Sequence, residues 1–173
     1  SQKIAEAGGF VSAAVYATVS GTVKMIEPRR VASGDMVMSI VVDNDGQYEE
    51  VPFVGRDPEK LSKEEIIEAI KEAGIVGMGG AGFPTHVKLS PKEPEKIDYV
   101  IANCAECEPY LTSDYRRMLE DPDKLVKGLK IILKLFPRAV GVLAVEDNKP
   151  ECIRLLKSLT KHEKRITVNV LKT

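Results

Sequence analysis

The 173-residue sequence contains no tryptophan and only 5% aromatic residues, and its basic residues nearly balance its acids, leaving a net charge of −1. Binding to nucleic acid needs a basic face, so this balance argues against that class. No run of about 18 apolar residues occurs, which argues against a membrane-spanning helix. The first residues also lack the charged-then-apolar pattern of a signal peptide. With 43% hydrophobic and 29% charged residues, the composition is that of an ordinary soluble globular chain.

Cysteine is also scarce, with only Cys104, Cys107 and Cys152 in the sequence. Three thiols do not make a disulfide framework in a chain of this size, so we expect a reducing, cytoplasmic environment. A cubane iron–sulfur cluster needs four thiolates, so this chain alone does not supply the ligands of one.

What the sequence does have is a glycine-rich stretch, Gly77-Met78-Gly79-Gly80-Ala81-Gly82-Phe83-Pro84-Thr85-His86-Val87-Lys88. Four glycines within six residues let the main chain enter left-handed conformations and bring its N–H groups close to a ligand. Successive N–H groups in a turn form an anion site, and Lys88 adds a positive charge. The interleaved apolar residues are unlike those of a flexible Gly/Ser linker. The stretch therefore predicts a site for a phosphate that carries a flat ring system.

Two familiar phosphate motifs do not describe this stretch. In GxxxxGK[ST] the lysine follows the last glycine directly, whereas Phe83 follows Gly82 here. The spacing of Gly77, Gly79 and Gly82 does match GxGxxG. That motif follows a strand and opens a long helix, however, and here a predicted helix comes before it.

A second motif follows the apolar segment 98–102 and reads Asn103-Cys104-Ala105-Glu106-Cys107-Glu108-Pro109-Tyr110. The pair GxGGAGFPTxxK and NxxExEP resembles the FMN-binding core shared by the flavoprotein subunit of respiratory complex I and the C subunit of the Rnf electron-transport complex. The segments GAGFPTHVKL and AECEPY are more similar to the Rnf protein than to the complex I subunit. The resemblance runs from about residue 74 to the end of the chain. It implies an FMN site that passes electrons between NAD(H), as substrate, and iron–sulfur centres.

The resemblance also implies roles for individual residues. The loop glycines Gly77, Gly79, Gly80 and Gly82, together with Lys88, would bind the FMN phosphate. Asn103 would contact the flavin ring or ribityl chain, and Glu106 and Glu108 would orient a nicotinamide nucleotide, with Phe83 near it. Met78 and Ala105 stand where complex I relatives carry Arg and Asp, which weakens the case for an identical nicotinamide site. No residue is expected to be a catalytic acid or base or a metal ligand, because the flavin carries the chemistry.

Residues 1–55 form a zone of their own. Period-two alternation between turn residues predicts strands over 11–18, 21–26 and 36–42. The segments 17–23 and 31–37 resemble the second half of a biotinyl/lipoyl-type domain, as found before the flavin domain in the C subunit of the Rnf complex. We therefore expect a partial all-β barrel-sandwich here. The place of a carrier lysine holds Ala7-Gly8-Gly9-Phe10, so a swinging-arm carrier is disfavoured.

Residues 56–173 are expected to form the FMN-binding α/β domain. Ser62 and Glu65 match a capping box at the start of a helix that ends at Gly74, and Asp121-Pro122 starts another helix. Strands over 98–102, 139–145 and 166–171 alternate with helices, the last of them over 150–159. This order predicts a Rossmann-like parallel sheet flanked by helices. Asn103 and Glu106 would then follow the carboxyl end of a strand, where ligands of such sheets bind.

Cys104 and Cys107 also have the CxxC spacing of a redox dithiol. Such dithiols need a lowered thiol pKa, whereas the neighbouring carboxylates of Glu106 and Glu108 act in the opposite direction. Two thiols are also only half of a metal site. A dithiol and a half-site completed by another subunit stay open as alternatives, and lining of a flavin pocket is favoured. His86 and His162 are both expected to be solvated.

These observations predict a fragment of a membrane-associated electron-transport flavoprotein that passes electrons between NAD(H) and iron–sulfur or ferredoxin partners. It would belong to an NAD/ferredoxin oxidoreductase complex, with 4Fe-4S clusters in a part of the parent protein beyond residue 173. The isolated fragment is expected to be inactive. The parent would lie on the cytoplasmic, inner face of the cell membrane through partner subunits. The alternative is a non-catalytic scaffold of the same fold that docks partner subunits without flavin.

Overall fold

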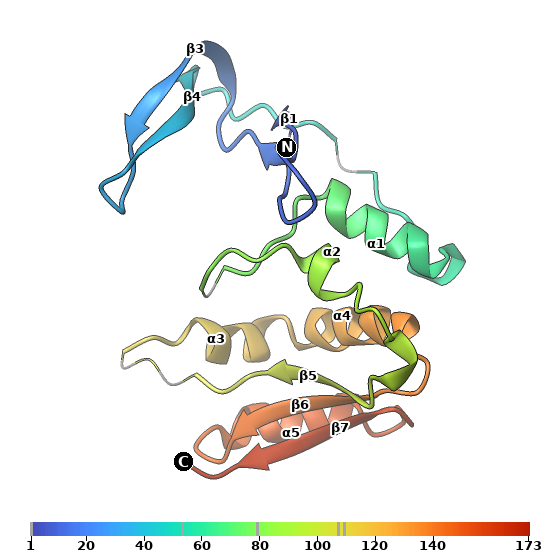
Figure 1. The fold of residues 1–173 in the computed structure, drawn as a ribbon. Coiled ribbons are helices and arrows are strands. Elements are labelled where there is room, and N and C mark those ends of the chain that lie inside the picture. The colour runs from blue at the N-terminus through green and yellow to red at the C-terminus, as the bar shows by residue number, and fades with distance from the viewer. Residues whose placement is uncertain (1, 53, 79, 107, 109) are drawn as a thin grey trace. The chain divides into compact units, whose positions relative to one another are not determined.

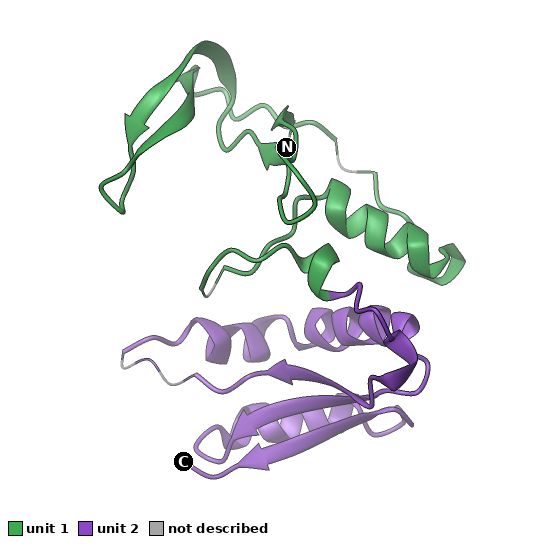
Figure 2. Ribbon diagram, viewed as in Figure 1, with its two compact units in different colours: residues 1–88 green, residues 89–173 purple. Residues whose placement is uncertain are grey.

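The computed structural model describes residues 2–52, 54–78, 80–106, 108 and 110–173 (Figure 1). The chain divides into two compact units, residues 1–88 and residues 89–173, which we call unit 1 and unit 2 (Figure 2). Unit 1 carries the antiparallel strands and the glycine-rich stretch, and unit 2 carries the parallel sheet. Within the described part of the chain, no helix is long and apolar enough to cross a membrane.

Unit 1 begins with two antiparallel strand pairs. The longer pair joins β3 (Gly21–Arg30) to β4 (Met36–Asn44), and extends both predicted strands. The shorter pair joins β1 (Lys3–Ala5) to β2 (Val15–Tyr16). The predicted strand over 11–18 is therefore wrong over most of its length, and β1 was not predicted. Between β1 and β2 the Gly8 N–H donates to the Ser12 hydroxyl at 3.1 Å, a local bond that competes with strand pairing.

Helix α1 (Lys63–Glu72) forms where the capping box predicts it. The Ser62 hydroxyl accepts a hydrogen bond from the Glu65 N–H at 3.2 Å, and the Glu65 carboxylate accepts one from the Ser62 N–H at 2.7 Å. Gly74 has a φ of +65° just after the helix, and a Cβ there would lie 2.9 Å from both the Ala14 carbonyl and the Tyr16 ring. Glycine is thus required at this point, because the end of α1 packs closely against β2 and the residue before it.

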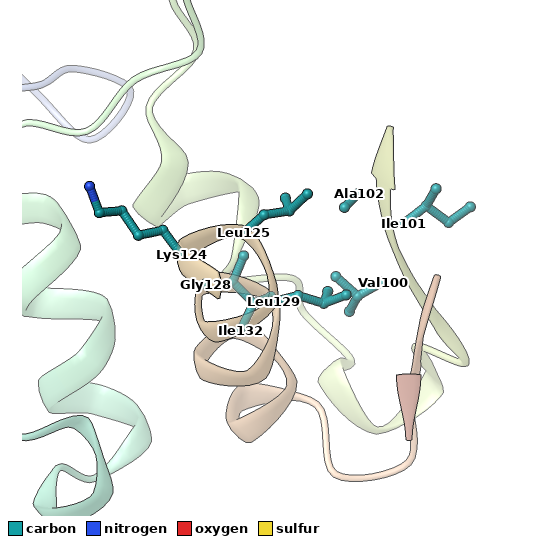
Figure 3. A pocket seen from close by; sticks show the side chains of 8 residues that line it. All are labelled: Val100, Ile101, Ala102, Lys124, Leu125, Gly128, Leu129 and Ile132. Carbon is teal, nitrogen blue, oxygen red and sulfur yellow. The ribbon is translucent and has the colours of Figure 1, made fainter. Parts of the chain in front are cut away.

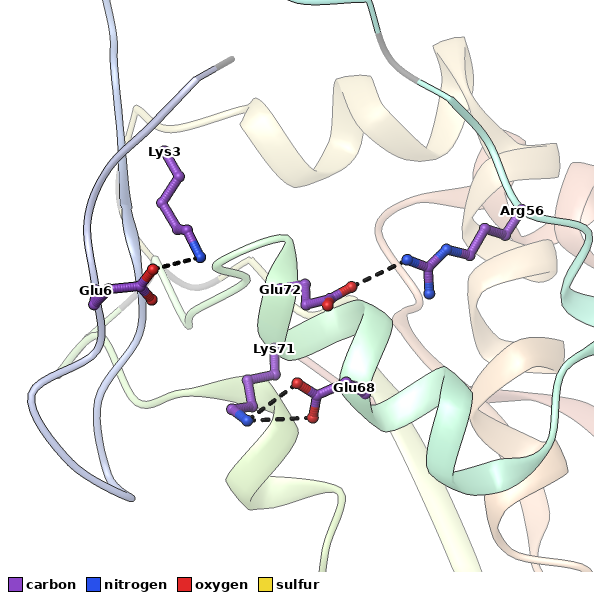
Figure 4. A network of polar contacts seen from close by, with 6 residues as sticks. All are labelled: Lys3, Glu6, Arg56, Glu68, Lys71 and Glu72. Carbon is purple, nitrogen blue, oxygen red and sulfur yellow. Dashed lines mark hydrogen bonds and ion pairs between the residues drawn. The ribbon is translucent and has the colours of Figure 1, made fainter.

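Exposed ion pairs decorate the surface of unit 1 (Figure 4). Lys3 pairs with Glu6 at 2.8 Å, Lys71 with Glu68 at 3.1 Å, and Arg56 with Glu72 at 3.1 Å. All six side chains are 44% or more exposed, so each pair contributes at most about 1 kcal/mol. The stability of α1 therefore comes mainly from its caps and from buried packing.

Unit 2 is a parallel sheet in the order β5-β6-β7, formed by β5 (Tyr99–Asn103), β6 (Val140–Glu146) and β7 (Ile166–Leu171). Helices α3 (Ser113–Glu120) and α4 (Pro122–Leu135) connect β5 to β6, and α5 (Pro150–Leu159) connects β6 to β7. This arrangement confirms the predicted β-α-β-α-β order and parallel sheet (Figure 1). Helix α3 was not predicted as a separate element. Three short helical turns, η1 (Pro58–Lys60), α2 (Thr85–Lys88) and η2 (Pro94–Lys96), complete the structure.

The core of unit 2 lies between the sheet and its helices. Because the strands follow one another in a single direction, right-handed crossovers place the connecting helices on the same face of the sheet. Gly141 allows this approach, since a Cβ there would lie 2.9 Å from Leu133 and 3.0 Å from Leu129 of α4. Nearly complete burial is shared by the core residues Leu129, Leu133, Leu143, Val145, Cys152 and Leu156.

Arg165, just before β7, closes the carboxyl end of α4. Its guanidinium donates hydrogen bonds to the carbonyl oxygens of Leu133, Phe136 and Ala139, at 3.2, 2.5 and 2.7 Å from Nη2. The last carbonyls of a helix have no partner within the helix. The planar, multidentate guanidinium satisfies them in a way that a lysine ammonium does not reproduce.

We predict that Arg165→Ala lowers the free energy of unfolding by about 2–3 kcal/mol, the loss expected for charge-assisted bonds to partly buried carbonyls. Arg165→Lys should recover less than half of this loss. Arg154→Ala, which removes an exposed arginine from α5, is the control and should change stability by less than about 0.5 kcal/mol. Chemical denaturation measures all three variants, and full recovery by lysine would contradict the assignment.

Candidate functional site

The glycine-rich stretch forms a closed loop in unit 1. The Gly77 N–H donates to the Phe83 carbonyl at 2.9 Å, and an antiparallel bridge joins Val76 to Pro84. One step further out, the Thr85 N–H donates to the Ile75 carbonyl at 3.0 Å. The base of the loop is thus held by main-chain hydrogen bonds, while its tip is exposed.

The tip of this loop has the features of an anion cradle. Among the described residues, the N–H groups of Gly80, Ala81 and Gly82 have no hydrogen-bond partner. A Cβ on Gly80 would have no heavy atom within 4 Å, so the main chain there is open to a ligand. Gly82 has a φ of +65°, which favours glycine. Unpaired donors and open space suit a phosphate group, and the predicted phosphate-binding residue Gly79 lies outside the described residues.

The residues that follow the loop divide into exposed and buried ones. Phe83 is 42% exposed, and Lys88, the last residue of α2, is exposed as well. His86 is only 5% exposed, so its predicted solvation is wrong, whereas His162 is exposed as predicted. Pro84 and Leu89, which flank His86 in the sequence, are buried as well, and the single turn of α2 packs against α1.

In unit 2, Asn103 ends β5 and is exposed at the carboxyl end of the sheet, as predicted. Its side-chain oxygen accepts a hydrogen bond from the Ala105 N–H at 3.2 Å. The ladder continues one residue further, since the Cys104 N–H donates to the Ala144 carbonyl at 2.9 Å. Asn103 therefore turns the chain away from the sheet at the edge where ligands of α/β proteins bind.

Glu106 caps helix α3 from a distance. One of its carboxylate oxygens accepts hydrogen bonds from the Ser113 hydroxyl at 3.2 Å and the Asp114 N–H at 2.8 Å. The other accepts one from the Tyr115 N–H at 3.3 Å. Thr112, at the N-cap position, makes no side-chain capping bond, so Glu106 takes over that role. Its negative charge at the helix N-terminus is favourable.

These contacts determine the ionisation of Glu106. Partial desolvation disfavours the charged carboxylate, but the hydrogen bonds from Asp114, Tyr115 and Ser113 outweigh it, with the Lys149 ammonium adding a smaller effect. The pKa of Glu106 is therefore held below its ordinary value. The carboxylate is charged at neutral pH and acts as an acceptor only.

Sequence reasoning missed Glu146, which ends β6 at the same edge of the sheet. Its carboxylate accepts a hydrogen bond from the Glu106 N–H at 3.2 Å. The signal was present, because Glu146 follows the apolar run 139–145 as Asn103 follows the apolar segment before it. Ligands of α/β sheets bind at the carboxyl ends of the strands, and applying this rule to every predicted strand identifies both Asn103 and Glu146.

Two further residues of the second motif, Glu108 and Tyr110, are exposed. Glu108 is exposed, and Tyr110 is fully exposed with a φ of +65°, a left-handed conformation uncommon for a bulky residue. Cys107 and Pro109 lie outside the described residues. Glu108 is thus accessible to a ligand.

Cys104 is buried after β5, and this environment suppresses its thiolate. Desolvation, followed by the nearby carboxylate of Asp114 and the thiol of Cys152, raises the pKa of Cys104 to about 11. Burial also raises the pKa of Cys152. The Cys104 thiol is therefore protonated at neutral pH, which disfavours it as the nucleophile of a reactive dithiol. Among the residues the structure describes, no group of three or more His, Cys, Asp or Glu side chains is arranged to hold a metal.

An apolar pocket of about 310 Å³ lies elsewhere in unit 2, between α4 and β5 (Figure 3). Its lining consists of Val100, Ile101, Ala102, Lys124, Leu125, Gly128, Leu129 and Ile132. None of the predicted site residues contributes to it. Its lining charge, Lys124, pairs with Asp121 at 3.0 Å, so the pocket does not resemble a phosphate site.

Comparison with protein families identifies both parts of the chain. The model described as the Nuo51 FMN-binding domain matches residues 70–173, and that described as the RnfC barrel sandwich hybrid domain matches residues 1–47. These matches confirm the predicted fold class and the resemblance drawn from the two motifs.

Curated relatives agree with this assignment. The chain is 46% identical over 158 residues to the C subunit of the proton-translocating ferredoxin:NAD(+) oxidoreductase complex of Clostridium ljungdahlii, covering 90% of this chain and 35% of that protein. It is 42% identical over 174 residues to the C subunit of the Na(+)-translocating ferredoxin:NAD(+) oxidoreductase complex of Acetobacterium woodii, covering 99% of this chain and 39% of that protein. The chain thus spans little more than a third of the length of these relatives.

Among solved structures, the chain shares its fold with an NAD+-reducing [NiFe]-hydrogenase crystallised in the air-oxidised state. The likeness covers 64% of this chain and 20% of that one, with a TM-score of 0.50 and 22% identity.

The raised pKa of Cys104 predicts a pH-dependent stability. The thiol has a pKa of about 11 in the folded chain, against an ordinary value of 9.0. The folded state therefore holds the proton more tightly, and this stabilisation is present below pH 9 and lost as pH rises to about 11. We expect Cys104→Ala to flatten the fall in unfolding free energy over this interval in denaturation at each pH. If the dependence of unfolding free energy on pH were the same in Cys104→Ala and the native chain, burial would not raise the pKa of this thiol.

Proposed function

We propose that this chain, which belongs to the Nuo51 FMN-binding domain family, binds FMN and passes electrons between NAD(H) and iron–sulfur or ferredoxin partners within a larger oxidoreductase complex. The observation that carries the proposal is the loop tip, where three consecutive N–H groups lack a partner among the described residues and the space at Gly80 is open. Backbone donors of this kind bind phosphate. The names of the two curated relatives, subunits of ferredoxin:NAD(+) oxidoreductase complexes, support the assignment of the electron partners.

Phosphate binding would fall to the loop. The loop of Gly77, Gly79, Gly80 and Gly82 is proposed to surround the FMN phosphate, with Lys88 as the compensating charge. The unpaired N–H groups of Gly80, Ala81 and Gly82 would donate to it, while the Gly77 N–H stays bonded to the Phe83 carbonyl and closes the loop. Asn103 is proposed to face the flavin from the carboxyl end of β5. Glu106 is proposed to border the cofactor site by shaping the segment after β5, because its carboxylate is held by three intramolecular donors. When bound, the flavin supplies hydride transfer with the nicotinamide and one-electron transfer to the iron–sulfur side. The chain's own residues bind and orient the flavin and the nicotinamide nucleotide, and none is needed as a general acid or base.

The nicotinamide nucleotide would contact Phe83 and Glu108. Both residues are accessible, with Phe83 42% exposed and Glu108 exposed. A partly exposed ring suits stacking against a flat heterocycle, and a carboxylate accepts hydrogen bonds from ribose hydroxyls or an amide. These two residues are therefore proposed as nucleotide contacts rather than flavin contacts.

The surrounding complex is part of the same proposal. We assign residues 1–55 to the partial barrel-sandwich and 56–173 to the FMN-binding domain. The chain has only three cysteines and a cubane cluster needs four, so the thiolate ligands of iron–sulfur clusters are expected on other segments or subunits. Other subunits would hold the protein at the inner, cytoplasmic face of the cell membrane, and this chain alone is expected not to oxidise NADH.

We predict that Gly80→Val weakens FMN binding by at least about tenfold, or ~1.4 kcal/mol, because its side chain fills the space that the phosphate needs. The fold should not change, since a Cβ at this position contacts nothing within 4 Å and its φ is not positive. Gly9→Val is the matched control, because Gly9 is equally open and lies outside the loop. Flavin titration of the complete protein measures both.

Unchanged FMN affinity in Gly80→Val would show that the loop is not the phosphate site. A purified protein without the visible absorption of flavin, and unable to take up added FMN, would instead favour the non-catalytic scaffold.

A second prediction concerns charge. Lys88→Ala should cost roughly 1.5–3 kcal/mol of FMN binding, about ten- to a hundredfold in Kd. Lys96→Ala removes another exposed lysine, which pairs with Glu93, and should leave FMN affinity unchanged. Cys107→Ser should have a much smaller effect than Lys88→Ala, since a thiol contributes packing and no essential charge. The opposite order, with the cysteine essential and the lysine dispensable, would favour a dithiol or a metal half-site.

A further inference from the structure

Tyr115, in the first turn of α3, connects three parts of unit 2. Its N–H donates to the Glu106 carboxylate at 3.3 Å. The ammonium of Lys149 lies 5.5 Å from the centre of its ring, within the range of a cation–π interaction. Its carbonyl accepts a weak hydrogen bond from the Cys152 thiol at 3.9 Å. Tyr115 thus ties the segment after β5 to the start of α5.

Lys149 stands where helix electrostatics disfavour a cation. It is the N-cap residue of α5, makes no side-chain capping bond, and places its positive charge beside the positive end of the helix dipole. The Tyr115 ring and the charged Glu106 carboxylate compensate for this position. An interaction that opposes the local preference indicates a role other than the stability of α5.

The turn from Glu146 to Lys149 contacts the segment 106–115 at two points. Glu146 accepts the Glu106 N–H at 3.2 Å, and Lys149 lies over the Tyr115 ring. The turn itself is closed by the Lys149 N–H donating to the Glu146 carbonyl at 3.1 Å. It is also anchored to β7, since the Asp147 N–H donates to the Leu171 carbonyl at 2.8 Å. This anchored turn therefore contacts both ends of the segment 106–115, which contains Glu108.

We propose that Lys149 is a positioning residue for the nicotinamide nucleotide, acting through Tyr115 and Glu106 on the segment that carries Glu108. This inference rests on the proposed function. Lys149 itself is not required to touch the nucleotide. Removing its charge frees the first turn of α3 from α5, so that Glu108 spends less time in its binding position, while the phosphate loop in unit 1 is unaffected.

The test compares Lys149→Met, Lys149→Arg and Lys157→Met in the complete protein in its native assembly. Lys157 is an exposed lysine on the same helix and serves as the control. We expect Lys149→Met to raise KM for NADH about three- to tenfold, with kcat and the Kd for FMN changed by less than about twofold. Lys149→Arg should restore KM to within about twofold of the native value, because a guanidinium also binds an aromatic face. Lys157→Met should match the native protein.

Hydrogen exchange provides a readout that does not depend on activity. Amides of residues 110–116 should exchange faster in Lys149→Met than in the native protein or in Lys157→Met. Unchanged exchange, or an unchanged KM in an active enzyme, would overturn the proposal. A parallel loss of FMN affinity would also overturn it by indicating a general structural role. If the native protein neither binds FMN nor oxidises NADH, the proposed function fails, and the exchange experiment still decides whether Lys149 holds this segment.

Discussion

Parallel strands cannot be joined by tight turns, and this constraint organises unit 2. Each connection must cross back over the sheet, and crossovers are right-handed. With the strands in the order β5-β6-β7, the helices therefore gather on one face, where Gly141 admits the leucines of α4. The same constraint brings the carboxyl ends of β5 and β6 together. The hydrogen bond between the Glu106 N–H and Glu146, two residues forty positions apart, follows from that meeting of strand ends.

Signals that depend on neighbouring residues were readable from the sequence. The capping box of Ser62 and Glu65, the proline that starts α4, and the strand β7 all occur as predicted. Features that depend on tertiary contacts were not. Helix α3 is capped by Glu106 rather than by its own N-cap residue, so local sequence carried no start signal for it. His86 is buried in a turn that packs against α1, and β1 forms by pairing with β2. The roles of the individual site residues stay predictions, because they depend on ligands.

The two motifs divide the chemistry of recognition between donors and acceptors. The glycine loop offers unpaired N–H groups and a lysine, which suit an anion. The segment after β5 offers carboxylates, of which Glu106 is already occupied by three intramolecular donors, whereas Glu108 is exposed. This difference separates the paired acids by function. Glu106 shapes the segment, and Glu108 is the one whose acceptor oxygens face solvent.

The main-chain bonds that close the base of the glycine loop bear on how fast the loop can rearrange. Main-chain bonds hold its ends, and the described residues Gly80, Ala81 and Gly82 near its tip are exposed; surface loops in general rearrange in nanoseconds to microseconds. Typical enzymes turn over about ten times per second. Rearrangement on the timescale of surface loops is orders of magnitude too fast to limit a cycle of that rate. Its cost is one of entropy instead, because glycine loses more conformational freedom on ordering than any other residue. A ligand bound by this loop would therefore have a lower affinity than one bound by a rigid site with the same donors. Its association rate would not be lower.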